Sequence, residues 1–385
     1  MSRQSPSAQS PNPPAIPGRA ALSATGSNSS AAPIDGASQP KGLVENSHAL
    51  RLAARDGHAR LVEKLIPVSD PKAHNSHALR VAAGNGHAEC VALLIPASLP
   101  DDMGSHALRW AAENGHAECV SLLLPFSNAR AHKSCALQVA AENGHAACVE
   151  LLIPFSEADV ACSLPLSLAA RRGHAECVKL LIPVSDLSAA RFLGLRAAAE
   201  NGHERCVELL APLFDARACS GALMAAAEAG HVGCARLLIA ASSPAEIQLS
   251  LLAAAKSGRA DCVKLLIPAA NPKSSGSLAL ENAARYGRED CVRLLIPVSD
   301  PLLNCPGALA AALHNGHLRV AMLLIEREPL LLADASLPSV LAQAIALGHS
   351  QLAPLLSAVI DKAELSSINV ASGNLRAQIP RSRRL

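Results

Sequence analysis

A glycine followed by histidine recurs at a nearly constant spacing through most of this 385-residue chain. Nine Gly-His pairs and two Gly-Arg pairs in the same frame lie 28 to 32 residues apart, most often 29. A short, regular period of this kind is typical of chains that fold as a stack of similar units. The glycines of the frame are Gly57, Gly86, Gly115, Gly144, Gly173, Gly202, Gly230, Gly258, Gly287, Gly316 and Gly348.

Two apolar stripes in each unit predict two short helices. Counting the glycine as position 0, leucine occupies −7 and +8 and alanine occupies −4 in all eleven units. Positions −7, −4 and −3 share one helical face, as do +4, +5 and +8. Glycine ends the first helix because it tolerates the left-handed conformation, and proline at +10 in eight units ends the second. We therefore expect an all-α solenoid of about eleven helix-turn-helix units over residues 43–360.

Serine at position −10 is predicted to cap the first helix. Its hydroxyl can accept a hydrogen bond from the free N–H groups of a first helical turn. The seven serines are Ser47, Ser76, Ser105, Ser134, Ser163, Ser220 and Ser277.

Composition favours many small interfaces over one large core. Half of the residues are hydrophobic, but only 2% are aromatic. Trp110, the single tryptophan, occupies −5, where other units have leucine or valine, so we expect it to fill the core. No stretch approaches the roughly 20 apolar residues that cross a bilayer, which predicts a soluble chain without a membrane span.

The charge distribution argues against a nucleic-acid partner. Residues 1–42 carry +2 and residues 361–385 carry +3, which leaves −3 for the body of a chain whose net charge is +2. Nucleic-acid binding needs a concentrated basic face. An acidic body with basic tails does not provide one.

The residues at 48–58, His-Ala-Leu-Arg-Leu-Ala-Ala-Arg-Asp-Gly-His, with Val62 and Leu65, resemble an ankyrin repeat. The resemblance implies a helix-turn-helix scaffold that binds proteins and is not an enzyme, with no cofactor. Two departures stand out, because ankyrin repeats usually run about 33 residues and their Thr-Pro-Leu-His is replaced here by residues 48–51. The connector is therefore shorter, and either a reduced hairpin or a plain loop joins successive units.

Cysteine and histidine invite disulfide and metal interpretations that the period opposes. Equivalent positions in stacked helical layers lie about 10 Å apart, beyond the roughly 7 Å Cα limit of a disulfide and too far to converge on one metal ion. We predict buried, unreactive thiols, a reducing compartment, structural histidines at +1 and no metal. The cysteines at +4 are Cys90, Cys119, Cys148, Cys177, Cys206, Cys234, Cys262 and Cys291.

No catalytic motif stands out in the sequence. A glycine-rich phosphate loop, a Gly-x-Ser-x-Gly elbow and a His-Glu-x-x-His pair are all absent. We predict no catalytic residue. An enzyme with an unrecognised site is the remote alternative.

Positions −6, −2 and −1 are not needed for packing and are the candidates for partner contacts. Positions −2 and −1 repeat Glu-Asn and then change at residues 171–172 and 285–286, while −6 is arginine in several units. By the ankyrin resemblance, −2 and −1 face partners along the concave side; the alternative is that these residues are solvated helix ends. The predicted contact residues of an otherwise monomeric chain are Arg51, Arg80, Arg109, Arg171, Arg172, Arg285 and Tyr286.

The two ends of the chain differ from its body. Residues 1–42 contain nine serines, seven prolines and one acid, a composition typical of disorder, and they lack the apolar core of a secretory signal peptide. This segment resembles the export signals of bacterial type III secreted effectors, which implies delivery into a host cytoplasm. The alternative is a plain disordered tail on a cytoplasmic adaptor. Residues 361–385 are predicted to form a polar, basic, disordered tail.

Overall fold

A computed structural model describes residues 41–157, 160–187, 193–270, 278–299, 301–327, 337–346, 348–350, 353–354 and 357. The predicted tails, residues 1–42 and 361–385, lie outside this range except for positions 41 and 42. The described residues are largely helical and contain no strand. The chain divides into two compact parts, an N-terminal part, Met1–Val160, and a C-terminal part, Ala161–Leu385.

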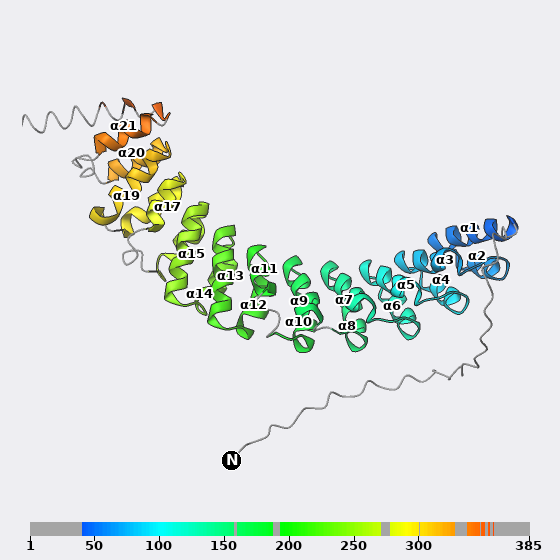
Figure 1. The fold of residues 1–385 in the computed structure, drawn as a ribbon. Coiled ribbons are helices and arrows are strands. Elements are labelled where there is room, and N and C mark those ends of the chain that lie inside the picture. The colour runs from blue at the N-terminus through cyan, green and yellow to red at the C-terminus, as the bar shows by residue number, and fades with distance from the viewer. Residues whose placement is uncertain are drawn as a thin grey trace, which may run out of the picture. The chain divides into compact units, whose positions relative to one another are not determined.

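The N-terminal part holds four consecutive helix pairs (Figure 1). The first helices α1, α3, α5 and α7 each pack against the next, and the second helices α2, α4, α6 and α8 do the same. A 3-10 turn follows each second helix and contains the proline of position +10. The helices are α1 (Lys41–Arg55), α2 (Ala59–Leu65), α3 (Ala73–Gly84), α4 (Ala88–Leu94), α5 (Asp102–Glu113), α6 (Ala117–Leu123), α7 (Ala131–Asn143) and α8 (Ala146–Leu152), with turns η1 (Ile66–Val68), η2 (Ile95–Ala97), η3 (Leu124–Phe126) and η4 (Ile153–Phe155).

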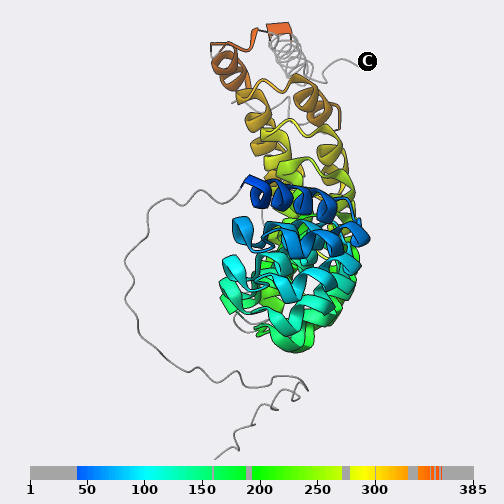
Figure 2. The same ribbon diagram turned by 90° about the vertical axis from the view of Figure 1, so that its right-hand side faces the viewer.

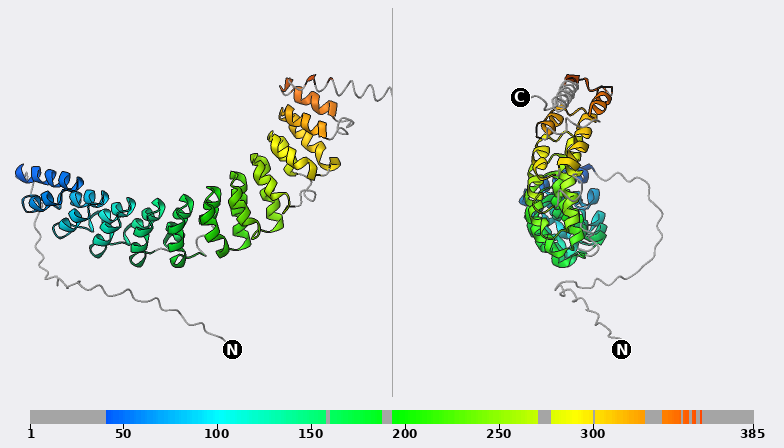
Figure 3. Two further views of the ribbon diagram at one scale, coloured as in Figure 1. Left: turned by 180° about the vertical axis from the view of Figure 1, so that it is seen from behind. Right: turned by 90° about the vertical axis from the view of Figure 1, so that its left-hand side faces the viewer.

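The C-terminal part continues the same pattern after α9 (Val160–Arg172), which begins at the boundary between the two parts. Seen along the stack, its first and second helices form two columns (Figures 2 and 3). The helices are α10 (Ala175–Leu181), α11 (Leu193–Glu200), α12 (Glu204–Leu210), α13 (Ala216–Ala229), α14 (Val232–Ile239), α15 (Pro244–Ser257), α16 (Ala260–Leu266), α17 (Leu278–Arg285), α18 (Glu289–Leu295), α19 (Pro301–His314), α20 (Leu318–Arg327) and α21 (Leu337–Ala346), with turns η5 (Ile182–Val184), η6 (Ala211–Leu213) and η7 (Ile296–Val298).

The core of each unit is a strip of small apolar side chains between the two layers of helices. The leucine at −7 is buried in all eleven units, and the leucine at +8 is buried in each unit from Leu94 to Leu324. Alanine at −3 and −4 lets the first helices approach closely. The predicted all-α helix-turn-helix fold is therefore confirmed. The connectors that the structure describes contain no strand, so a short turn, which is a 3-10 turn in seven units, and a plain loop join these units.

The repeated glycine is required by both its backbone and its surroundings. All eleven glycines have φ between +66° and +103°, a region that residues with a β carbon rarely adopt. At Gly202, a β carbon would also lie only 2.6 Å from Nδ1 of His231 in the next unit. The glycine thus ends one helix and makes room for the following layer.

The prediction that serine −10 caps its own helix is wrong. Within α3, residues 74–76 have left-handed backbone angles, so the right-handed helix begins after Ser76, but the Ser76 hydroxyl accepts from Leu99 rather than from the first turn of that helix. In four units the buried hydroxyl instead accepts a hydrogen bond from the backbone N–H at position +13 of the same unit, after the 3-10 turn, whereas Ser163 donates to the Asp186 carbonyl and Ser220 donates to the Ala216 carbonyl. The pairs are Ser47 with Asp70 at 2.9 Å, Ser76 with Leu99 at 3.0 Å, Ser105 with Asn128 at 2.7 Å and Ser134 with Glu157 at 2.9 Å.

The +1 side chain links each unit to the preceding one. Nε2 of the histidine lies at hydrogen-bond distance from the carbonyl oxygen at −2 of the unit before, and because a carbonyl only accepts, Nε2 carries the hydrogen. The pairs are His87 with Arg55 at 2.9 Å, His116 with Gly84, His145 with Glu113, His203 with Arg171 and His317 with Arg285, all at 3.0 Å, and His349 with His314 at 3.1 Å.

Arginine replaces this histidine at two positions without losing the bond. Nε of Arg259 donates to the Glu228 carbonyl at 3.2 Å, and Nε of Arg288 donates to the Lys256 carbonyl at 3.1 Å. The position therefore selects a planar N–H donor of suitable reach. A metal ligand would not be replaced by a guanidinium group.

Replacing His116 tests this link. We expect His116→Ala to lower the free energy of unfolding by about 1 kcal/mol, because the Gly84 carbonyl loses its donor. We expect His116→Arg to cost less than about 0.5 kcal/mol, because arginine supplies the same bond elsewhere in the stack. Urea unfolding followed by the fluorescence of Trp110 measures both, and equal losses would contradict the interpretation.

The cysteines at +4 lie in the core strip. All eight are at most 1% exposed, and none of the eight forms a disulfide. Burial raises the pKa of the thiols of Cys119, Cys177, Cys206, Cys234 and Cys291 to about 11. These thiols stay protonated at neutral pH, and the thiol is much less nucleophilic than the thiolate.

Alkylation of the native protein at pH 8 tests this. We expect Cys119, Cys177, Cys206, Cys234 and Cys291 to remain unmodified by iodoacetamide while the half-buried Cys135 reacts, and all of them to react in urea. Peptide mass spectrometry measures each site. Labelling of Cys206 as fast as Cys135 in the native state would contradict the burial described here.

Candidate protein-binding surface

Position −2 combines a fixed backbone with a variable side chain. Its carbonyl accepts the bond from the next unit, so the backbone is held whatever the residue is. The side chain varies along the stack, with Glu113, Arg171 and Arg285 among its occupants. This position can change its chemistry without disturbing the stack.

Asparagine at −1 has a structural role that sequence analysis missed. Nδ2 of Asn85 donates to the Arg55 carbonyl at 2.9 Å, and Nδ2 of Asn143 donates to the Glu113 carbonyl at 2.8 Å, the same oxygens that accept from the +1 histidines. Units with arginine or tyrosine at −1 lack this amide. The asparagines at −1 of three other units, Asn114, Asn201 and Asn315, instead donate to the carbonyl four residues earlier in their own helix. Arg172 and Tyr286 therefore stand at a position where an asparagine supports the stack in two units.

The predicted contacts at −2 and −1 lie at two separate places in the C-terminal part. Arg171 and Arg172 are exposed at the end of α9, and Arg285 and Tyr286 lie at and just after the end of α17. Helices α11, α13 and α15 lie between these two in chain order, so the structure does not bring the pairs together.

The residues at the end of α17 are partly engaged. Nη2 of Arg285 lies 2.5 Å from Oε1 of Glu281, which offsets its charge. Tyr286 is 44% exposed, and Nζ of Lys256 lies 5.7 Å from the centre of its ring. The phenol ring remains accessible beside a cation.

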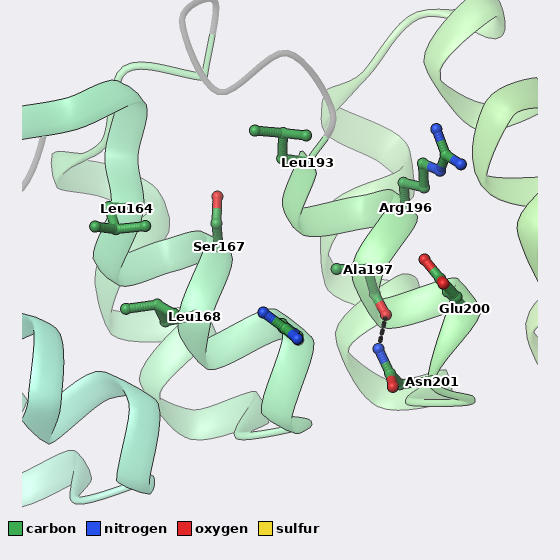
Figure 4. A pocket seen from close by; sticks show the side chains of 9 residues that line it. Leu164, Ser167, Leu168, Leu193, Arg196, Ala197, Glu200 and Asn201 are labelled. Carbon is green, nitrogen blue, oxygen red and sulfur yellow. Dashed lines mark hydrogen bonds between the residues drawn. The ribbon is translucent and has the colours of Figure 1, made fainter.

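A pocket of about 410 Å³ lies between α9 and α11 (Figure 4). Leucines and an alanine supply its apolar part, while Arg196 points away from α9 in this view. The Asn201 amide is used within its own helix, where it donates to the Ala197 carbonyl at 2.7 Å. The lining residues are Leu164, Ser167, Leu168, Arg171, Leu193, Arg196, Ala197, Glu200 and Asn201.

The predicted arginines at −6 form a row on the first helix of each of the first three units, α1, α3 and α5. Arg51, Arg80 and Arg109 are half-buried on α1, α3 and α5, each beside a histidine at −9 of its own helix. Sequence analysis did not single out these histidines, although the recurring His-Ala-Leu-Arg segment was a visible signal. The arginine–histidine row is defined as Arg51, Arg80, Arg109, His48, His77 and His106.

Arg80 connects two layers of this row. Its Nη2 lies 3.1 Å from Nδ1 of His77 on α3, and its Nη1 lies 3.0 Å from Nδ1 of His106 on α5. Nη1 also lies 3.5 Å from the sulfur of Met103. Nε2 of His106 in turn meets a guanidinium nitrogen of Arg109.

The imidazoles of His77 and His106 favour their neutral form. Burial lowers the pKa of both His77 and His106, and nearby guanidinium groups lower it further, those of Arg80 and Arg51 for His77 and those of Arg109 and Arg80 for His106. A neutral imidazole has one nitrogen lone pair that can accept from arginine.

The expectation that Trp110 fills the core is wrong. Its side chain is half-buried, its ring centre lies 4.9 Å from that of His106 in an edge-to-face arrangement, and Cζ of Arg80 lies 5.9 Å from the ring centre. A β carbon on Gly84 would lie 3.1 Å from the indole, so the glycine at −2 gives the ring its space. Trp110 therefore flanks the arginine–histidine row.

The described part of the chain offers neither a metal site nor a membrane span. Within it, no three histidine, cysteine, aspartate or glutamate side chains are grouped so that they could hold a metal ion. None of its helices has the length and apolar character needed to cross a membrane.

Comparisons with known proteins identify the repeat. A family model described as ankyrin repeats (3 copies) matches residues 50–134, 126–191 and 223–305, together more than half of the chain. A comparison with curated proteins gives no match. Among solved structures, the crystal structure of the human ASB11 ankyrin repeat domain is similar, with 21% identity over 50% of this chain and 83% of that one and a TM-score of 0.29.

The likeness to the solved structure concerns the fold and supports no argument about function. Ankyrin repeats indicate a protein–protein interaction scaffold. The predicted resemblance to ankyrin repeats is confirmed, and the chain belongs to the ankyrin-repeat family.

Proposed function

We propose that this chain is a non-catalytic scaffold that binds a protein partner through the side chains at −6, −2 and −1 of its first helices. The observation that carries the proposal is the separation of roles at −2. The carbonyl of this position holds the stack, while its side chain changes from glutamate to arginine without cost to packing. Surface variation on a fixed framework is how repeat proteins select partners.

The chemistry of the variable positions fits this role. Arginine and tyrosine are enriched among the residues that contribute most to binding energy at protein interfaces. Arg172 and Tyr286 stand where other units have a structural asparagine. The pocket between α9 and α11 adds a mixed apolar and charged hollow next to Arg171, suited to one partner side chain.

A triple substitution tests this surface. We expect Arg172→Ala/Arg285→Ala/Tyr286→Ala to weaken partner binding at least about tenfold while leaving the helix content unchanged, because all three side chains lie on the surface. The partner is isolated by affinity capture with the intact chain, purified and titrated calorimetrically against each variant.

The matched control is Arg60→Gln/Lys64→Gln/Arg236→Gln, which removes exposed charges from the second helices α2 and α14. We expect its affinity to stay within about twofold of the intact chain. A first variant that keeps full affinity removes these three residues from the surface, and turnover of a captured partner argues for an enzyme.

We further propose that residues 1–42 serve as an export signal of a bacterial effector that acts in a host cytoplasm. The supporting observation is compositional, since nine serines and seven prolines accompany a single acidic residue. A cytoplasmic ankyrin-repeat adaptor without export is the alternative.

Deletion of residues 1–42 tests the export proposal. We expect the truncated chain to remain inside bacteria that carry a type III secretion system while the intact chain appears in the medium, because the proposed signal lies ahead of the first glycine of the repeat, Gly57. Immunoblots of cell and medium fractions measure this, with circular dichroism as the folding control. Equal export of both chains would eliminate the proposal.

A further inference from the structure

The arginine–histidine row of the N-terminal part carries more positive charge than nearby acidic side chains neutralise. Within the described ranges, no carboxylate forms an ion pair with Arg51, Arg80 or Arg109. The acids of the neighbouring connectors are used locally, since Oδ1 of Asp101 accepts from the Asn128 N–H at 3.0 Å and Oδ1 of Asp70 accepts from the Lys72 N–H at 3.0 Å.

His106 cannot satisfy both of the arginines that reach it. Arg80 approaches its Nδ1 and Arg109 approaches its Nε2, and both guanidinium groups can only donate. A neutral imidazole has one accepting nitrogen, and an imidazolium has none. One of the two guanidinium groups is therefore always left facing a donor.

Two further donors lack an acceptor. Nε of Arg80 and Nε of Arg109 are buried and have no hydrogen-bond partner among the described residues. An unpaired buried polar group is costly, and more so when it is charged. A carboxylate placed over this row would accept from these arginines bidentately and relieve the conflict at His106.

From these contacts we infer that the row binds an acidic segment of a protein partner, in a polyproline II conformation, with aspartate or glutamate at every third residue. The inference rests on the scaffold function proposed above and names the partner chemistry for the N-terminal part. Packed helices lie about 8–10 Å apart. Three residues of a polyproline II chain complete one turn and advance about 9 Å, so acidic side chains at i, i+3 and i+6 share one face and match successive arginines.

Apolar features beside the row favour a peptide over a nucleic acid. The Trp110 ring lies against His106, and Met103 is 51% exposed next to Arg80. A cavity of about 260 Å³ lies beside Arg51, lined by Val44, Ser47, His48, Arg51, Ala73 and His74. Three arginines fall short of the roughly six to ten phosphate contacts that support nucleic-acid binding.

Titration with defined peptides tests the inference on the full-length chain. The probe is a fluorescein-labelled twelve-residue peptide with glutamate at every third position and serine or alanine between, compared with its glutamine counterpart and with a peptide that groups the same glutamates together. Fluorescence anisotropy at about 50 mM salt, where surface charges act over more than about 10 Å, measures binding.

We expect saturable binding of the regularly spaced glutamate peptide, about threefold tighter than the grouped peptide, and none of the glutamine peptide. Arg51→Gln/Arg80→Gln/Arg109→Gln should weaken it at least about tenfold, while Arg60→Gln/Lys64→Gln/Arg236→Gln stays within about twofold. If the first triple variant unfolds, Arg80→Gln is compared with Arg60→Gln, and a weakening of about threefold or more for Arg80→Gln alone is expected.

Three outcomes would overturn the inference: no binding of the spaced peptide, equal affinity of the two triple variants, or equally tight binding of a single-stranded RNA that carries the same number of charges. The scaffold proposal is judged separately, on Arg172, Arg285 and Tyr286 of the C-terminal part. Loss of partner binding there together with no peptide binding here would reject only the acidic-segment inference.

Discussion

The hydrogen bond from the +1 side chain to the −2 carbonyl of the preceding unit is the interaction on which the rest of the stack depends. It requires a glycine at position 0, because the incoming imidazole occupies the place where a β carbon would stand, as at Gly202. It requires a donor of fixed reach, which explains why His203 and Arg288 can occupy equivalent positions. One contact thus accounts for both residues of the repeated dipeptide.

The same bond also decides which side chains are free to recognise a partner. Leucine, alanine, cysteine and valine of the units are used in the core strip, and in two units the asparagine at −1 also supports the −2 carbonyl. What remains variable is the side chain at −2, the exceptional residues at −1 and the row at −6. A low aromatic content is compatible with this arrangement, since Tyr286 lies exposed at −1 and the half-buried Trp110 flanks the row at −6.

The N-terminal part shows how a local exception generates a surface. Glycine at −2 of one unit, Gly84, makes room for the indole of the next, and the indole lies beside the guanidinium of Arg80 and the ring of His106. Each residue taken alone is an unremarkable variant of its position. Together they produce a cationic face flanked by an apolar ring.

The sequence by itself determined the helix pairs, the glycine turns, the proline-bearing ends and the buried leucines, because these follow from residues within one period of the repeat. Only the tertiary structure decided the partner of Ser76, 23 residues away, and of His116, 32 residues away. It also placed Trp110 in a half-buried position beside the row instead of in the core, and gathered His77 and His106 around Arg80. Such contacts depend on side chains that only packing brings together, so no pattern within a single unit specifies them.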